Sequence, residues 1–389
     1  MQKVVVILTQ PIESNTSSMI RCKNIVKAIA QNGHQLTCFC PYPNVKKNNI
    51  EESDGDRVGL DVRRFGGEKN IKEYIANENV SRGFKQKVIM LAYKLFKKFD
   101  VFGASLQYLR YRKQICSEIQ KEKFDIMITF SDPMTSHMIG VYCKRFLNIK
   151  YVQQWGDPLT TDIISKTALP KNVRFLIENA LLKPADRVCY VSPFTCEEQQ
   201  QLFKKYAHKM IFLPTPCIEY KKMSKEKEKR IRIGYFGSYN LVARDIRPFY
   251  QAACAIPECD FLIIGDSDLH LEPRDNIQII ERLSPSELDS YEQKTDVLVC
   301  LMNSKGNQIP GKVYHYAGSY KEILFIKDGE FGDKIEEFFA KYERYSFVEN
   351  RASEIETVIK QYIAKGIPER RPLADFAAVN IAKELLKDI

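Results

Sequence analysis

The sequence predicts an α/β protein built from two parallel α/β domains. The chain has 389 residues, which is too long for one ordinary domain and enough for two. Short apolar strands alternate with helical patterns from the N-terminus onwards, and the alternation starts again at Ile231. A charged segment without periodicity separates the two series. We therefore expect domains at 1–218 and 231–370, a linker at 219–230 and a C-terminal helix in 371–389.

The first domain opens with the pattern strand, loop, helix, strand. We expect a strand at Lys3–Thr9, a helix at Ser17–Gln31 and a strand at His34–Cys40. Gly33 suits the position after the helix, where a left-handed backbone is common. The first loop is rich in serine and asparagine and lacks a GxGxxG motif, which argues against a simple nicotinamide dehydrogenase.

The other strands of the first domain are apolar runs that end at polar turns. We expect strands at Asp61–Phe65, Phe124–Phe130, Tyr151–Trp155, Arg187–Val191 and Ile211–Leu213, and helices at Met134–Phe146 and 172–184. The formal charge is +10, and basic residues alternate with apolar ones between Arg82 and Lys123. That pattern fits either a helix on an anionic membrane surface or ordinary helices packed on a sheet. No nucleic-acid-binding motif accompanies the charge.

The second domain repeats the alternation. We expect strands at Ile231–Phe236, Phe261–Ile264, Ile277–Ile280, Asp296–Met302 and Ile323–Ile326, and helices at Arg247–Ala255 and Ser286–Gln293. The last segment, Leu373–Ile389, has an apolar helical face that must pack against something, and we expect it to return to the first domain.

The stretch from Gly306 to Ile326 is the candidate ligand site. Pro310 is tolerated at the start of a helix, because a residue there has no intrahelical partner for the missing N–H. The helix would run through Tyr320, and its first amides would point at an anion. Lys312 adds a positive charge, so a phosphate-bearing ligand is expected. The alternative is an ordinary strand–loop–helix turn that binds nothing.

Composition indicates the compartment. The 11 cysteines show neither zinc spacing nor a disulfide framework, and no secretory signal is evident, so we expect reduced cysteines in a cytoplasmic protein. No apolar run is long enough to span a bilayer, so we expect a soluble or peripheral protein.

Four stretches resemble bacterial glycosyltransferases of the GT-B fold, in the retaining family 4 group. They are Phe124–Pro133 together with Tyr151–Pro158, Asp186–Pro193, Gly234–Ser238, and Gln308–Lys312 with the VYHYAGSYKEIL that follows. Their order and spacing extend over nearly the full chain. The resemblance implies two Rossmann-like domains facing each other across a cleft. It also implies a nucleotide-diphosphate sugar as co-substrate and no metal or other cofactor.

The resemblance also implies site residues. The backbone of Gly237 and Ser238 would approach the donor diphosphate, and Arg244 or Arg247 with Lys312 would neutralise it. The other donor-binding positions are Asn307, Gln308, Ile309, Pro310, Gly311 and His315. Asp157 joins Arg244 and Lys312 as a candidate catalytic residue, although a turn or cap role before Pro158 is the alternative. The acceptor-side candidates are Ser17, Ser131, Asp132 and Trp155.

This sequence departs from the family pattern on the donor helix. The two family glutamates correspond to Asn307 and His315, and Tyr320 and Glu322 replace the usual glycine and proline. His315 could accept a hydrogen bond from a ribose hydroxyl only through one ring nitrogen. Its alternative role is structural.

The predicted function is that of a retaining, family 4-like hexosyltransferase in cell-surface polysaccharide biosynthesis. Its partners would be a nucleotide-sugar donor and a glycan or lipid-linked acceptor, without nucleic acid. The predicted location is cytoplasmic, with peripheral contact to the inner face of an anionic cell membrane as an option. The alternatives are a GT-B-fold nucleotide-sugar epimerase and a degenerate, non-catalytic binding protein.

Overall fold

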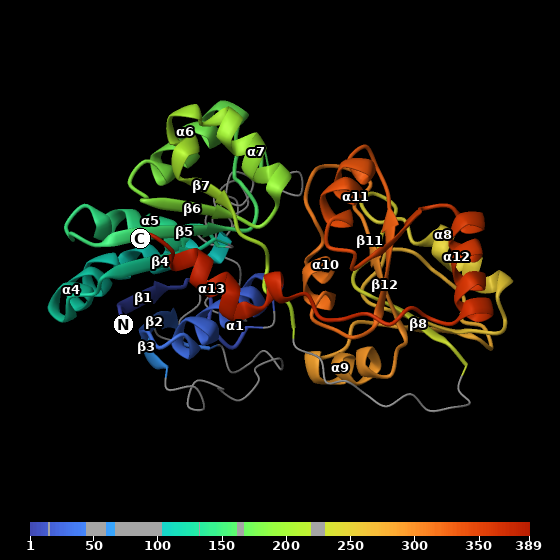
Figure 1. The fold of residues 1–389 in the computed structure, drawn as a ribbon. Coiled ribbons are helices and arrows are strands. Elements are labelled where there is room, and N and C mark those ends of the chain that lie inside the picture. The colour runs from blue at the N-terminus through green and yellow to red at the C-terminus, as the bar shows by residue number, and fades with distance from the viewer. Residues whose placement is uncertain (15, 44–59, 67–102, 132, 162–166, 219–229) are drawn as a thin grey trace, which may run out of the picture. The chain divides into compact units, whose positions relative to one another are not determined.

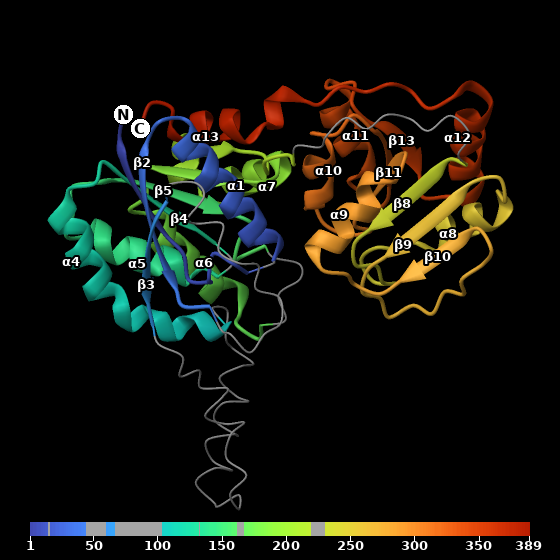
Figure 2. The same cartoon turned by 90° about the horizontal axis from the view of Figure 1, so that it is seen from below.

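The computed structural model describes residues 1–14, 16–43, 60–66, 103–131, 133–161, 167–218 and 230–389 (Figures 1 and 2). The chain divides into two compact units. Unit 1 comprises Met1–Leu213 and Ala382–Ile389, and unit 2 comprises Pro214–Ile381. The C-terminal residues therefore belong to the same unit as the N-terminus. The predicted linker lies almost entirely outside the described residues.

Unit 1 is built on a 7-stranded parallel sheet with the order β3-β2-β1-β4-β5-β6-β7. The strands are β1 Lys3–Ile7, β2 Gln35–Pro41, β3 Asp61–Phe65, β4 Ile126–Phe130, β5 Lys150–Trp155, β6 Arg187–Tyr190 and β7 Met210–Phe212. The helices are α1 Ser17–Gln31, η2 Gly103–Tyr111, α4 Arg112–Glu122, α5 Thr135–Lys144, α6 Lys171–Leu182, α7 Pro193–Leu202 and η3 Lys204–Lys209.

Unit 2 is built on a 6-stranded parallel sheet with the order β10-β9-β8-β11-β12-β13. The strands are β8 Arg232–Phe236, β9 Asp260–Ile264, β10 Ile277–Ile280, β11 Val297–Leu301, β12 Glu322–Lys327 and β13 Ser346–Glu349. The helices are α8 Arg247–Ala255, α9 Pro285–Gln293, α10 Gly311–Tyr316, α11 Gly332–Ala340, α12 Ala352–Lys365 and η4 Ala374–Phe376. The last helix, α13 Ala378–Leu386, continues into unit 1.

Both sheets are doubly wound, which confirms the predicted fold class. In unit 1 the strand order changes direction between β1 and β4, and in unit 2 it does so between β8 and β11. Sheets of this kind bind ligands beyond the carboxyl ends of their strands at that switch point. A ligand site in unit 2 is therefore expected at the segments that follow β8 and β11.

Local sequence signals explain where several helices start. The Thr16 hydroxyl caps α1 by accepting from the Met19 amide, and Gly33 follows that helix with φ +83°, in the left-handed region. Ser284 and Glu287 form a capping box on α9. Ser192 caps α7 ahead of Pro193. Helix α7 was not predicted, although Ser192-Pro193 is a usual start of a helix.

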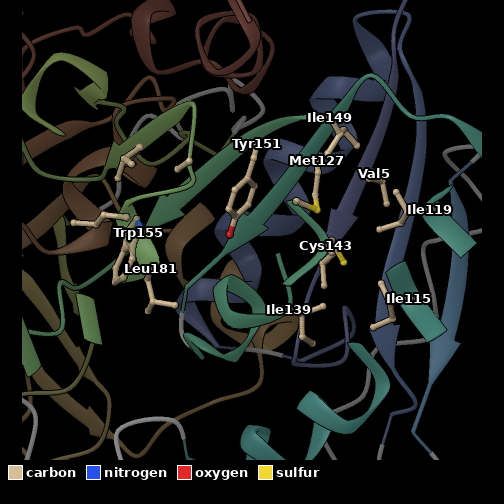
Figure 3. Close-up of a cluster of buried hydrophobic side chains, with 14 of the residues drawn as sticks. Val5, Ile115, Ile119, Met127, Ile139, Cys143, Ile149, Tyr151, Trp155 and Leu181 are labelled. Carbon is tan, nitrogen blue, oxygen red and sulfur yellow. The ribbon is translucent and has the colours of Figure 1, made fainter. Parts of the chain in front are cut away.

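The core of unit 1 lies between the sheet and the helices that cover it. Figure 3 shows Met127, Tyr151 and Trp155 from the strands together with Ile139 and Leu181 from α5 and α6. All five side chains are buried. Their contacts account for the apolar character of the predicted strands.

One expectation needs revision. The helix predicted through Tyr320 ends at Tyr316, because the buried Arg344 guanidinium donates to the carbonyls of Tyr316 (3.3 Å) and Ser319 (2.8 Å). The first half of the basic segment between Arg82 and Lys123 lies outside the described residues, and its second half forms η2 and α4. Within the described ranges, no helix is both long and apolar enough to cross a membrane.

Candidate functional site at the switch point of the second sheet

Two loops meet at the switch point of unit 2, because the strands that precede them are paired. β8 and β11 run in parallel, with Val299 opposite Tyr235. The Ser304 amide, in the loop after β11, donates to the Ala243 carbonyl (2.8 Å), and the Ser304 hydroxyl donates to the Val242 carbonyl (3.0 Å). The loop after β8 is therefore bound directly to the loop after β11.

The turn Gly237-Ser238 begins the first of these loops. The Gly237 amide donates to Ile264 (2.9 Å), and the Tyr235 hydroxyl donates to the Ser238 carbonyl (2.9 Å). Burial raises the pKa of Tyr235 to about 12, so this hydroxyl keeps its proton at neutral pH. A Cβ added to Gly237 would lie 3.4 Å from its nearest neighbour, an ordinary contact. Packing alone therefore does not require glycine at 237, whereas close approach of a ligand to the backbone would.

Arg244 is held on a tight hairpin. Asn240 and Arg244 exchange two backbone hydrogen bonds of 3.0 and 3.1 Å, and the Asn240 side chain accepts from the amides of Val242 and Ala243. Arg244 Nε then donates to Oδ1 of the buried Asn303 (2.8 Å). Asn303 Nδ2 donates to the Gln308 carbonyl (3.3 Å). This chain of bonds joins the hairpin, the end of β11 and the loop that precedes α10.

The other two predicted cations are paired with carboxylates. Arg247, exposed at the start of α8, makes a two-point ion pair with Asp245 (2.8 and 2.6 Å). Lys312 pairs with Glu292, which is 4% exposed at the end of α9. The same Glu292 oxygen accepts from the Tyr316 hydroxyl (3.1 Å), and Lys312 Nζ lies 5.0 Å from the centre of that ring.

The loop before α10 contributes mostly backbone. Asn307, Gln308 and Ile309 are half-buried, Pro310 is buried, and Gly311 is exposed. Pro310 takes the N-cap position of α10, one residue earlier than the first helical position. The helix has only 6 residues, so its dipole is small, and side chains must supply most of the positive charge.

His315 is buried at 6% exposure on α10. Its carbonyl accepts from the Ile218 amide (3.1 Å), and its ring lies under the first turn of the helix, 3.9 Å from where a Cβ on Gly311 would be. The described geometry therefore gives His315 a supporting position within unit 2.

The predicted acceptor-side residues all belong to unit 1. Ser131, 1% exposed, accepts from the Gly156 amide (2.7 Å) and so joins the ends of β4 and β5. Asp157 follows that turn and is half-buried. Ser17 is exposed as the first residue of α1. Asp132 lies outside the described residues.

Trp155 is a core residue, which corrects its prediction as an acceptor contact. It is fully buried, its ring lies 4.5 Å from that of His137, and Nε1 donates to Gln153 (3.1 Å). Burial lowers the pKa of His137 to about 3, so that imidazole is neutral. Ser131 is likewise covered, and its hydroxyl supports the turn before Asp157 instead of facing an acceptor.

The segment after Asp157 is fixed by buried polar groups. Glu178 Oε2 accepts from the Thr160 amide (2.7 Å) and hydroxyl, and Arg174 Nη1 donates to the Leu159 carbonyl (3.1 Å). Burial raises the pKa of Glu178 to about 7. These contacts set the path of the chain at the carboxyl end of β5.

Asn303 and Glu292 belong to the site but were not predicted from the sequence. Asn303 had a usable signal, because it is the first polar residue after a buried strand that ends at the switch point. Glu292 had none, because its role depends on how α9 packs on α10. Among the described residues, no group of three or more His, Cys, Asp or Glu is placed to hold a metal ion.

No protein-family model matches the chain, and no curated protein matches it in sequence. Solved structures do resemble it. Sucrose-phosphate synthase from Thermosynechococcus elongatus is similar over 99% of this chain and 93% of that one, with a TM-score of 0.60 and 14% identity.

Two further structures extend the similarity. Anabaena HepE in complex with UDP and glucose matches over 99% of this chain and 95% of that one (TM-score 0.56, 10% identity). The lipopolysaccharide outer core galactosyltransferase WaaB matches over 98% of this chain and 97% of that one (TM-score 0.55, 9% identity). Together with the two doubly wound sheets, these similarities show that the chain has the GT-B fold.

Proposed function

We propose that this protein is a glycosyltransferase that moves a sugar from a nucleotide-diphosphate donor to a glycan or lipid-linked acceptor. The placement of Arg244 carries the proposal. It lies at the switch point of a doubly wound sheet, beside the glycine turn that follows β8, and a hairpin and Asn303 fix its direction. A departing diphosphate needs a pre-positioned cation at such a place.

The donor half-site has a clear division of roles. The backbone of Gly237-Ser238 and of Asn307–Gly311 would approach the diphosphate, and Arg244 would stabilise the negative charge that develops as the glycosidic bond breaks. Lys312 and Arg247 would contribute less than Arg244, because Glu292 and Asp245 already offset their charges. No metal ion is part of this proposal.

The acceptor half-site is assigned to unit 1. Asp157 is its candidate polar group, at the carboxyl end of β5, where Ser131 and Glu178 hold the surrounding chain. The transfer would retain the anomeric configuration of the sugar, and the transferred sugar would be a hexose, as in family 4. The enzyme would act in the cytoplasm, in the synthesis of a cell-surface polysaccharide. Unit 1 carries the whole of the net positive charge, which supports an anionic acceptor or membrane surface as its partner.

A second candidate is a non-catalytic binding protein of the same fold. Asn307 and His315 stand where the family pattern has glutamates, and Lys312 is paired within unit 2. This candidate predicts that sugar transfer is absent even where a nucleotide binds.

A thermal-shift titration tests the proposal first. Purified protein is titrated with millimolar UDP, GDP, ADP and CMP, because a ligand that binds only the folded state raises the melting temperature. We expect one diphosphate to stabilise the wild type. We also expect Arg244→Ala to remove most of that shift, and the exposed Arg274→Ala, which precedes β10, to leave it unchanged. No shift with any nucleotide would contradict the donor site.

Product analysis with the matching nucleotide sugar then separates the candidates. Transfer that requires an acceptor supports the glycosyltransferase. A new nucleotide sugar formed from donor alone indicates an epimerase. Nucleotide binding without either product indicates the binding protein.

A further inference from the structure

Asn303 uses both ends of its side-chain amide, and only one orientation of the amide fits. Oδ1 accepts from Arg244 Nε (2.8 Å), and Nδ2 donates to the Gln308 carbonyl (3.3 Å). An arginine nitrogen can only donate and a carbonyl can only accept, so the partners fix which atom is oxygen and which is nitrogen. The residue is 7% exposed, so neither bond is readily replaced by water.

Arg244 differs from the two neighbouring cations in the charge of its partner. Arg247 and Lys312 face the carboxylates of Asp245 and Glu292, which offset their charge. Arg244 donates to a neutral amide, which fixes the direction of the guanidinium and leaves its positive charge available to an anion.

The path of the hairpin backbone does not depend on Asn303. Ser304 binds the hairpin through the Ala243 and Val242 carbonyls, and Asn240 closes the turn from inside. The bond from Asn303 therefore acts on the Arg244 side chain and on the loop at Gln308. A flexible arginine loses side-chain freedom when it binds an anion, and fixing it beforehand reduces that loss.

We propose that Asn303 is a positioning residue for the donor diphosphate, which it serves by orienting Arg244 and the Gln308 loop without cancelling the arginine charge. The inference rests on the proposed function. The positioning role also explains why asparagine suits position 303 better than aspartate. Aspartate at this position would neutralise Arg244 and could not donate to the Gln308 carbonyl.

A double-mutant cycle tests the inference. Dissociation constants for UDP, GDP and ADP are measured by calorimetry for the wild type, Asn303→Ala, Arg244→Ala and the double variant. We expect Asn303→Ala to raise the dissociation constant of the tightest-binding nucleoside diphosphate about tenfold. The double variant should bind that diphosphate no more weakly than Arg244→Ala does. The matching monophosphate should lose less affinity than the diphosphate, because the oriented charge faces the diphosphate.

Two further variants sharpen the test. Asn303→Asp keeps the size of the side chain and should bind at least as weakly as Asn303→Ala. Ser304→Ala removes only the bond to the Val242 carbonyl and should change affinity less than twofold. Melting temperatures without nucleotide establish that each variant is folded.

The outcomes separate the inference from the proposed function. If Asn303→Ala or Asn303→Asp binds as well as the wild type, or if Asn303→Ala weakens binding equally with and without Arg244, the positioning role is wrong while the donor site stands. If the wild type binds none of the three diphosphates, both are overturned.

Discussion

The side chain of Lys312 connects two helices of unit 2. Its ammonium pairs with Glu292 of α9 and lies over the Tyr316 ring on α10. Glu292 is buried, so it depends on this partner and on the Tyr316 hydroxyl for its stability. Removing Lys312 would therefore lower the stability of the fold as well as the affinity for a bound anion.

Lys312→Ala should lower the free energy of unfolding by about 1–3 kcal/mol, because it leaves the Glu292 carboxylate buried without its counter-charge. The loss is smaller than for a fully buried ion pair, because 30% of the Lys312 side chain is exposed to solvent, which screens the interaction. The double variant Lys312→Ala/Glu292→Gln should recover most of the loss. Urea denaturation measures all three proteins, and a Lys312→Ala variant as stable as wild type would show that the pair contributes nothing.

Glu178 makes the stability of unit 1 depend on pH. Burial raises its pKa from 4.5 to about 7, and a nearby Glu198 charge acts in the same direction. Between these two values the folded protein holds a proton that the unfolded chain has lost. Stability therefore falls as pH rises through this interval, by on the order of 3 kcal/mol.

Glu178→Gln should remove this loss, because glutamine keeps an acceptor for Thr160 and cannot ionise. Unfolding free energies are compared at pH 5 and pH 8. We expect the variant to gain stability relative to wild type at the higher pH. His137, whose pKa is lowered to about 3, works in the opposite sense, costing stability as pH falls below 6.5, and is unchanged by the substitution. The same pH dependence in both proteins would refute this role for Glu178.

At the scale of elements, the close approach of β9 to β8 shapes the candidate site. Gly265, at the end of β9, has φ +156°, and a Cβ there would lie 2.1 Å from the Gly237 carbonyl oxygen. Backbone atoms cannot yield as a flexible side chain can. Any larger residue at 265 must therefore displace the glycine turn after β8.

Gly265→Ala should destabilise unit 2 by about 2 kcal/mol or more and should also weaken nucleotide binding, since it moves the Gly237-Ser238 turn. Gly237→Ala is the matched control. Its new Cβ meets only an ordinary contact, so we expect a near-native melting temperature with weaker nucleotide binding. Thermal melts with and without the stabilising diphosphate measure both effects. If Gly265→Ala is folded and binds the nucleotide as tightly as the wild type, Gly265 does not control the position of the Gly237-Ser238 turn.

Sequence patterns predicted most of the elements, because buried parallel strands are continuous apolar runs. Helix α8 and strands β3 and β10 match their predicted bounds. The region of α11, β13 and α12 had no prediction. There β13 is only 4 residues long, whereas α12 carries Ile355, Ile359 and Tyr362 at helical spacing, a signal that was available.

The site could be predicted only in outline. The Gly237 turn and the loop before α10 follow from strand ends, which the sequence locates. The pairing of Lys312 with Glu292, the bond from Asn303 to Arg244 and the burial of Trp155 depend on tertiary packing. Neither spacing nor composition contains that information.

At the scale of the whole molecule, the two units share one topological plan. Each sheet grows outward in both directions from a central pair, β1 with β4 and β8 with β11. The plan recurs without an evident repeat in the sequence, because it depends on apolar strands, short loops and right-handed crossovers, which many sequences satisfy. This explains how identities of 9–14% accompany a shared fold.

The assignment of residues 382–389 to unit 1 has a consequence for biosynthesis. The ribosome completes residues 1–213 first, then all of unit 2, and only afterwards the segment whose Glu384 and Leu385 carbonyls accept from Arg187. During translation the first unit therefore lacks the end of helix α13 until the whole second unit has been synthesised. Until residues 382–389 are made, the nascent first unit exposes the surface that Leu385 and Leu386 later bury, so its assembly is completed only after the second unit has been synthesised.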